Sequence, residues 1–148
     1  KWDQALAVNV TAVFLASQVA ARRMIERGGP GRIIQISSVM ARGANPVHKV
    51  VGYSASKGAV DNLTRQLAVE WAQYGITVNA IAPSYFETDM TEHARGNEQA
   101  TALIMARTPL NRYGRIEELI GLVVYPACDN SSYMTGAVIP LDGGWTAG

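Results

Sequence analysis

Three short apolar runs, each preceded by a long helix-like stretch, constrain the fold of this chain more than any other feature. The runs are rich in Ile, Val and Ala and lie at residues 32–37, 76–81 and 137–141. The stretches before them have helical periodicity and lie at residues 1–27, 53–74 and 116–128. Apolar runs of this kind are typical of strands covered on both faces. The alternation therefore predicts an α/β fold, a doubly wound parallel sheet with helices on both faces.

Glycine and proline residues mark the predicted boundaries. The cluster at residues 28–31 should be a turn, because it precedes a strand, whereas a dinucleotide phosphate loop follows a strand and opens a helix. Gly75 is expected to cap the second long helix, and Pro126 to shorten or bend the third. Residues 91–107 are expected to form one polar helix that serves as a mobile cover.

Composition excludes several classes of function. The chain has 148 residues, and its 13 basic and 12 acidic side chains are scattered, which gives no indication of nucleic-acid or anionic-membrane binding. The single cysteine, Cys128, allows no internal disulfide, and His48 and His93 have no second ligand at useful spacing, so no metal site is expected. No apolar run approaches the length of a membrane span, which favours one cytoplasmic structural unit over residues 1–148.

Tyr53 and Lys57 form the first candidate catalytic pair. They stand four residues apart in a helix-like stretch, so their side chains should share one helix face. The ammonium group would favour phenolate over phenol, which makes the pair suitable for proton transfer. A hydroxyl at the end of a nearby strand could hold a substrate oxygen against the phenol, and this arrangement suits reversible oxidation of an alcohol.

Ser37 and Ser38 compete for that role at the end of the first predicted strand. Side chains alternate between the faces of a strand, so only one of the two serines can point into the site. Ligands of parallel α/β sheets bind beyond the carboxyl ends of the strands, where Ser38, residues 83–88 and Asp142 all fall. We therefore expect the chemistry at this edge of the sheet.

With these elements in place, the chain resembles the short-chain dehydrogenase/reductase family along nearly its whole length. The matching segments are Val8-Asn9-Val10, residues 32–38, Tyr53-Ser54-Ala55-Ser56-Lys57-Gly58, residues 76–83, residues 87–90, Arg112-Tyr113-Gly114 and residues 141–144. The resemblance implies a Rossmann-type sheet and four catalytic residues. Tyr53 would be the general acid/base and Lys57 its electrostatic partner and ribose ligand. Ser38 would orient the substrate oxygen, and Asn9 would support a proton relay through water to the lysine.

The same resemblance implies NAD or NADP as the cofactor. Residues 83–88 match the loop that packs on the nicotinamide, with Pro83 and Ser84 at its start. A main-chain group near Phe86 and the hydroxyl of Thr88 would bind the carboxamide, while Tyr53 and Lys57 also contact the cofactor. The family usually has glycine where this chain has Ser84, so a side chain stands either where backbone commonly approaches the cofactor or where glycine eases the turn.

The family's amino-terminal half has no counterpart in this sequence: a glycine-rich turn after a first strand and a residue that reads the adenosine ribose are both missing. We therefore expect the chain to be the carboxyl-terminal portion of such a domain, without the strands that bind the dinucleotide. The choice between NAD and NADP then stays open. The stretches at residues 1–27 and 53–74 match helices that pair in family dimers and tetramers, which implies a homo-oligomer.

Three hypotheses follow for function. Residues 84–91 and 108–114 most resemble members that oxidise gluconate-like sugar acids, which implies hydride transfer between nicotinamide and a secondary alcohol or ketone. The alternative enzyme is a 3-oxoacyl-[acyl-carrier-protein] reductase, which shares much of this pattern. The non-enzymatic alternative is a truncated, inactive assembly module. An incomplete sequence record would also explain the missing half.

Overall fold

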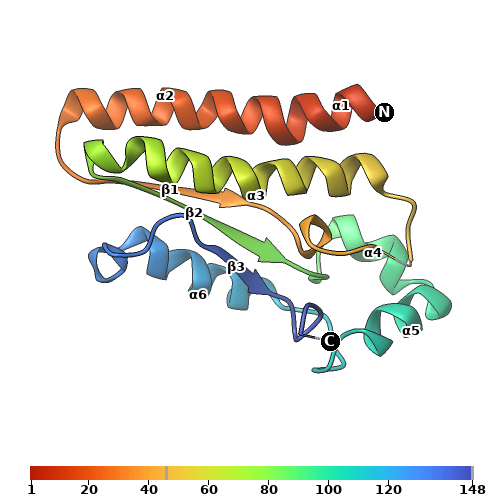
Figure 1. The fold of residues 1–148 in the computed structure, drawn as a ribbon. Coiled ribbons are helices and arrows are strands. Elements are labelled where there is room, and N and C mark those ends of the chain that lie inside the picture. Colours follow the sequence, from red (N-terminus) through yellow and green to blue (C-terminus); the bar gives the residue numbers. More distant parts are fainter. Residues whose placement is uncertain (46, 148) are drawn as a thin grey trace.

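A computed structural model describes residues 1–45 and 47–147. Its centre is a parallel sheet in the order β1-β2-β3 (Figure 1). The strands are β1 (Gly31–Ile36), β2 (Ile76–Pro83) and β3 (Val138–Leu141). Ile33 is paired with Val78, and Ala80 with Val138. The prediction of a parallel sheet is confirmed, and each strand begins within a residue of its predicted position.

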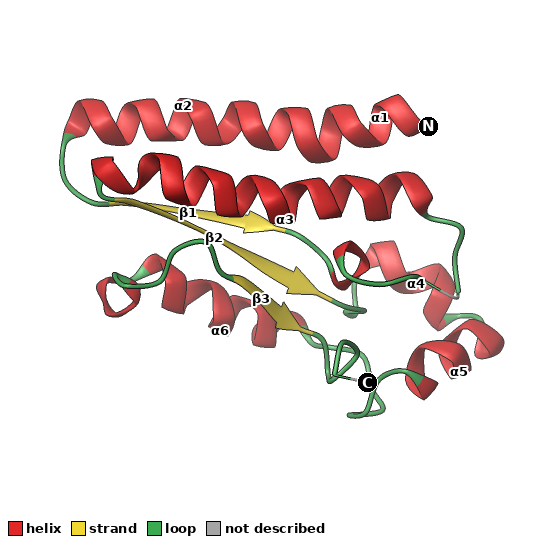
Figure 2. Cartoon of the chain, in the orientation of Figure 1, coloured by secondary structure: helices red, strands yellow, loops and turns green. Residues whose placement is uncertain are grey.

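Helices cover both faces of the sheet (Figure 2). One continuous helix consists of α1 (Trp2–Leu6), a π-helical turn (Ala7–Thr11) and α2 (Ala12–Arg27). It lies beside α3 (Val51–Trp71), which a 3₁₀ turn (Ala72–Tyr74) extends to Gly75. The opposite face carries α6 (Ile116–Ala127), which contacts β1 and β2. The doubly wound arrangement is therefore confirmed.

Buried apolar and polar contacts join the first two strands to their helices. The apolar core on this side contains Ala21 of α2, Leu67 of α3, and Ile33, Ile76 and Val78 of the sheet. Gln35 of β1 is also buried, and its amide donates to Ser17 Oγ (3.2 Å) and accepts from Thr64 Oγ1 (2.7 Å). One strand residue thus ties both helices to the sheet with its polar atoms satisfied.

The other side of β1 differs from the prediction of a strand covered on both faces. Gly31, Ile33 and Gln35 are buried, but Ile36 is 46% exposed. In the described part of the chain, β2 is the only strand paired with β1. Ile36 therefore lies on an edge strand and lacks the cover that a second neighbouring strand would give. The prediction that this strand is covered on both faces is wrong.

The segment at residues 91–107 also differs from the prediction. It forms two helices, α4 (Asp89–Arg95) and α5 (Glu98–Ala106), because Gly96 interrupts the first and the Asn97 side chain caps the second by accepting from Ala100 N (3.0 Å). The segment is not a detached cover, since Ala94 and Ile104 pack with Val39, Met40 and Trp145 in a second apolar cluster. This cluster supports the carboxyl edge of the sheet.

The predicted turns are confirmed. Gly28 and Gly29 connect α2 to β1 with φ of 73° and 83°, a left-handed backbone that glycine adopts without strain. Gly75, with φ of 69°, ends the helical segment before β2. Pro126 lies in the last turn of α6, which ends one residue later at Ala127.

The helix over Trp2–Arg27 contradicts the prediction that no membrane-length apolar run exists. By length and composition it is able to cross a membrane, with a mean hydropathy of 1.4 in an 18-residue window of which 11% is buried. One side of it packs on α3 and β1. Val8, Leu15 and Val19 are more than half exposed on the remainder.

Candidate active site

A cavity of about 300 Å³ opens beside the carboxyl ends of β1 and β2. Its apolar wall includes Val39, Met40, Val50, Met90 and Ala94. Its polar wall consists of Ser38, Asn45, His48, Tyr53, Ser84, Tyr85 and Thr91. The cavity therefore lies at the sheet edge where the sequence predicts the chemistry, and it brings together three of the predicted site residues, Ser38, Tyr53 and Ser84.

The structure separates the two serines at the end of β1. The Ser37 hydroxyl donates to the buried Asp61 carboxylate and also lies 3.4 Å from the Lys57 carbonyl oxygen, so it points into the packing against α3. Ser38 lines the cavity; its Oγ accepts from Met40 N (3.2 Å) and is 3.5 Å from the Pro83 carbonyl oxygen. Of the two serines, only Ser38 borders the cavity that Tyr53 lines.

Tyr53 and Lys57 approach one another as their helical spacing predicts. Lys57 Nζ lies 5.6 Å from the centroid of the Tyr53 ring and donates to the Ile36 carbonyl oxygen at 2.7 Å. Lys57 is only 9% exposed. Burial lowers the pKa of its ammonium group below the ordinary 10.5, and the nearby Asp61 carboxylate opposes that shift. A cation is therefore held beside the phenol in a partly desolvated position.

Asp61 is a charged neighbour of this pair that the sequence reasoning missed. It is 5% exposed, accepts the Ser37 hydroxyl and lies 3.6 Å from Arg42 Nε. Arg42 in turn donates to the Val138 carbonyl oxygen of β3 at 2.9 Å. Its position four residues after Lys57 could have indicated it, because this spacing places both charges on one face of α3.

Asn9 is not among the residues that line the cavity. The residue stands in the π-helical turn, and its Nδ2 donates to Ser56 Oγ at 2.9 Å. Ser56 Oγ donates to the Tyr53 carbonyl oxygen at 2.7 Å. Two hydrogen bonds thus connect Asn9 to the backbone of the tyrosine, and π-helical turns are frequent at functional sites.

The loop at residues 83–88 places its predicted residues in different surroundings. Ser84 lines the cavity of about 300 Å³ that Ser38 and Tyr53 also line, called the main cavity below. It also lines a second, smaller cavity of about 70 Å³. Its φ is not positive, so the backbone here does not require the glycine that the family usually has. Of the two expected consequences of Ser84, an eased turn is therefore not at issue, and what the structure shows is a serine side chain on the cavity wall.

Phe86 and Thr88 do not line the main cavity. The Phe86 side chain lines the smaller cavity, and its carbonyl oxygen accepts the Thr91 hydroxyl. Thr88 caps α4: its amide donates to Thr91 Oγ1 at 3.2 Å, and its hydroxyl is 3.5 Å from the same atom. Thr91, which the sequence reasoning did not single out, thus organises the end of this loop and also reaches the cavity.

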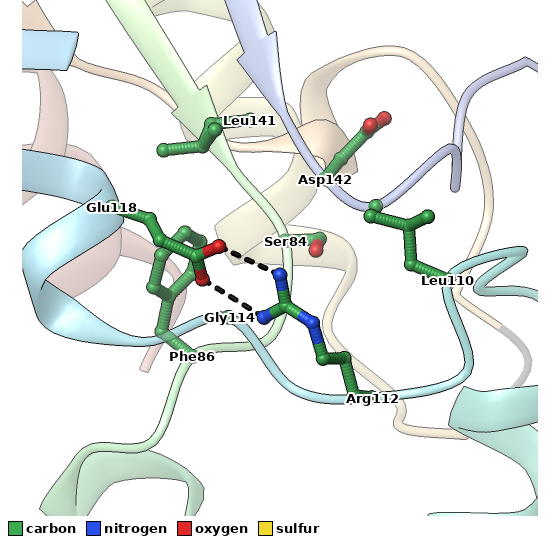
Figure 3. A pocket seen from close by; sticks show the side chains of 9 residues that line it. Ser84, Phe86, Leu110, Arg112, Gly114, Glu118, Leu141 and Asp142 are labelled. Atoms are coloured by element: carbon green, nitrogen blue, oxygen red, sulfur yellow. Dashed lines mark hydrogen bonds and ion pairs between the residues drawn. The ribbon is translucent and has the colours of Figure 1, made fainter. Parts of the chain in front are cut away.

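An ion pair lies in the lining of the smaller cavity (Figure 3). Arg112 donates from Nη1 and Nη2 to the two carboxylate oxygens of Glu118, at 2.9 and 2.6 Å. These hydrogen bonds, with that from the Arg115 amide, lower the pKa of Glu118 to about 2. Since Arg112 and Glu118 are paired with each other, the pair supports the loop, and the remaining charged side chain in the lining is that of Asp142.

Replacing Gly114 by Ala should disturb this support. A methyl group at residue 114 would lie 2.7–2.9 Å from three atoms of the buried Phe86 ring, so the ring and its loop must move. We expect a loss of about 1–3 kcal/mol in the free energy of unfolding, measured by urea denaturation. The control is Gly121→Ala at an exposed position of α6, where a methyl group meets nothing within 4 Å. Equal stability of the two variants would contradict this packing.

Tyr85 stands at the centre of an aromatic cluster on the cavity wall. Its ring centroid lies 5.4 Å from that of Trp145, 6.5 Å from that of Tyr113 and 6.4 Å from that of His48. Its hydroxyl oxygen accepts from Asn45 Nδ2 at 3.0 Å. Burial raises the pKa of Tyr85, the hydrogen bond from Asn45 opposes that shift, and the neighbouring Tyr113 and Tyr53 add to it.

No metal centre emerges from residues 1–45 and 47–147: they contain no group of three or more His, Cys, Asp or Glu side chains arranged to hold a metal ion. His48 and His93 are both exposed. Asp142 at the end of β3 is occupied by its own turn. Burial tends to raise its pKa, but hydrogen bonds from the Thr146 hydroxyl and from the Gly144 and Thr146 amides lower it overall.

Comparison with known proteins agrees with this geometry. The family model described as Enoyl-(Acyl carrier protein) reductase matches residues 1–146. Gluconate 5-dehydrogenase of Gluconobacter oxydans is 43% identical over 145 residues, which are 98% of this chain and 56% of that protein. 2-Dehydro-3-deoxy-D-gluconate 5-dehydrogenase of Escherichia coli is 41% identical over 146 residues, 99% of this chain and 57% of that protein.

A solved structure shows the same fold. The crystal structure of a gluconate 5-dehydrogenase from Burkholderia cenocepacia, in complex with NADP and tartrate, has a TM-score of 0.94 and 37% identity, and the match covers 99% of this chain and 56% of that one. The chain thus spans a little over half the length of these relatives. With a family match over nearly every residue and a shared fold, the chain belongs to the short-chain dehydrogenase/reductase family.

Proposed function

We propose that this chain carries the catalytic residues of an NAD- or NADP-dependent oxidoreductase that interconverts a secondary alcohol and a ketone of a gluconate-like sugar acid. One observation carries the proposal. Ser38 and Tyr53 line the same cavity, and the Lys57 ammonium group lies 5.6 Å from the Tyr53 ring. A hydroxyl, a phenol and a buried cation in this order are the groups that proton transfer to a carbonyl oxygen needs.

Each side chain has a distinct role in this mechanism. The Ser38 hydroxyl donates a hydrogen bond to the substrate oxygen and holds it against Tyr53. The Tyr53 phenol gives its proton to the developing alkoxide in reduction and accepts it back in oxidation. Lys57 stabilises the negative charge that remains on the phenol, and its effect is strengthened by partial burial. A nicotinamide cofactor, when bound, would supply or accept the hydride.

The residues around Lys57 fit a cofactor ribose. Lysine has three N–H donors, and the described residues provide one acceptor to Nζ, the Ile36 carbonyl oxygen. The remaining donors suit the hydroxyls of a nicotinamide ribose. Pro83, Ser84, a main-chain group near Phe86 and Thr88 would hold the nicotinamide end, as the resemblance implies. Asn9 would assist through a proton relay, and its hydrogen bonds through Ser56 also restrain the turn that carries Tyr53.

Relatives support a sugar acid as the substrate. Two curated relatives are named as dehydrogenases of gluconate or 2-dehydro-3-deoxy-D-gluconate, and the solved relative contains NADP and tartrate, a hydroxy acid. The cavity also presents polar side chains beyond Ser38 and Tyr53, which an extended acyl chain would leave without partners. A sugar acid is thus favoured over an acyl chain as the substrate, and 3-oxoacyl reductase activity is the alternative that the test distinguishes from it.

The test uses the full-length product of the gene that encodes this chain. Reduction of NAD⁺ and NADP⁺ at 340 nm is followed with D-gluconate, and oxidation of NADH and NADPH with 5-keto-D-gluconate and with a 3-oxoacyl thioester. We expect turnover with the sugar acid pair. Turnover with the thioester alone would favour the 3-oxoacyl reductase. No turnover with any substrate, together with no change in NADPH fluorescence on titration, would favour a non-catalytic assembly module.

We further propose that the protein is a cytoplasmic homo-oligomer. Support comes from the helix over Trp2–Arg27, whose exposed side carries Val8, Leu15 and Val19. In family oligomers the corresponding helices pair between subunits, which would cover these side chains without a membrane. Sedimentation velocity of the full-length protein should show a dimer or tetramer. A monomer, or recovery only from the membrane fraction, would contradict this arrangement.

A further inference from the structure

Tyr85 and Asn45 form a hydrogen-bonded pair whose orientation the surrounding groups determine. Asn45 Oδ1 accepts the amides of Val47 (2.8 Å) and His48 (3.2 Å). The oxygen of the Asn45 side chain is thereby fixed, so the nitrogen must face Tyr85. Asn45 Nδ2 donates to the Tyr85 oxygen, and the phenolic proton must then point elsewhere.

The phenolic proton of Tyr85 has no acceptor among residues 1–45 and 47–147, although both members of the pair line the main cavity. The ring is half-buried and packed between Trp145, Tyr113 and His48, so it is held in place before any ligand arrives. Trp145 itself is 4% exposed, with the Arg107 guanidinium 4.9 Å from its ring. Burial also raises the pKa of Tyr85, which keeps the group a neutral donor.

We propose that Tyr85, oriented by Asn45, donates a hydrogen bond to a second oxygen of the substrate and so selects polyhydroxylated acids over substrates with a single oxygen. This inference rests on the proposed function and names a specificity residue for it. Ser38 and Tyr53 bind the reacting oxygen, while Tyr85 donates a hydrogen bond to a neighbouring hydroxyl or carboxylate on the same carbon chain. A substrate without that oxygen would leave a partly buried donor unsatisfied, which is the strongest basis for rejecting a near analogue.

The experiment compares Tyr85→Phe with wild type in the full-length protein, using D-gluconate and 2-butanol as paired substrates. We expect kcat/KM for D-gluconate to fall roughly 10- to 100-fold, while that for 2-butanol changes less than about twofold. Asn45→Ala should raise KM for D-gluconate with little change in kcat, because Tyr85 loses its orientation and the catalytic groups remain. The matched control, Tyr113→Phe, removes a hydroxyl whose one partner in the described chain is Thr101 Oγ1 at 3.2 Å, and should leave both substrates unaffected.

Two outcomes would overturn the inference: an equal fall for both substrates, or no fall for either. Isothermal titration of D-gluconate into the NADP-saturated protein gives a readout that does not depend on turnover. If wild type turns over no alcohol, the proposed function fails, and the titration still decides the role of Tyr85. Weaker binding to Tyr85→Phe supports the role, and failure of wild type to bind D-gluconate contradicts it.

Discussion

Replacement of Tyr53 by Phe is expected to lower kcat by about a thousandfold, or about 4 kcal/mol of transition-state stabilisation. The substitution keeps the ring that lines the cavity and removes only the proton that the substrate oxygen needs. Because Lys57 and the loop at residues 83–88 are unchanged, the Kd for NADPH should stay within about twofold of wild type. Stopped-flow measurement of the hydride-transfer step separates this chemical effect from slow product release.

The control for Tyr53→Phe is Tyr125→Phe, which removes a hydroxyl from a half-exposed position on α6. Its kcat should equal that of wild type. If Tyr53→Phe retained near-normal turnover, the proton would have to come from another group, and the assignment of Tyr53 as general acid/base would be wrong. If instead NADPH affinity collapsed, Tyr53 would act chiefly in cofactor binding.

Replacement of Lys57 by Met should lower kcat by about 10²- to 10³-fold and weaken NADPH binding by roughly 10-fold. Methionine fills a similar volume, but it removes the cation beside the Tyr53 ring and the donors available to the ribose. A combined loss in kcat and cofactor affinity distinguishes this variant from Tyr53→Phe. The control Lys49→Met removes an exposed lysine from the loop before α3 and should leave both parameters unchanged. Unaltered NADPH affinity in Lys57→Met would contradict the ribose contact.

The same variant has a consequence for the pH dependence of stability. The pKa of Lys57 in the folded protein lies below its ordinary value of 10.5, so the unfolded chain binds the proton more tightly. Protonated Lys57 therefore reduces the free energy of unfolding at neutral pH, and this penalty is relieved as the pH rises through the folded pKa towards 10.5. Relative to Lys57→Met, wild type should gain stability over that range in urea denaturation. A constant difference between the two proteins would show that burial of the lysine has no such cost.

The architecture was predictable because it depends on neighbouring residues. Apolar periodicity and glycine turns act over a few residues, and they placed all three strands, the two long helices and the turn at Gly28 and Gly29 correctly. The failure at residues 91–107 has the same local character, since Gly96 and the capping Asn97 were readable stop and start signals. Ile36 was mispredicted because cover depends on which strand lies beside it, and this is not a local property.

The sequence by itself determined the helix–strand order and the common helix face of Tyr53 and Lys57, because side-chain direction within a helix follows from spacing alone. Tertiary structure alone decided that Ser38 lines the cavity while Ser37 binds Asp61, and that Asn45 holds Tyr85 across 40 residues of sequence. The two serines have the same chemistry, and only packing against α3 distinguishes them. Contacts of that kind form where distant segments meet, so no pattern within either segment encodes them.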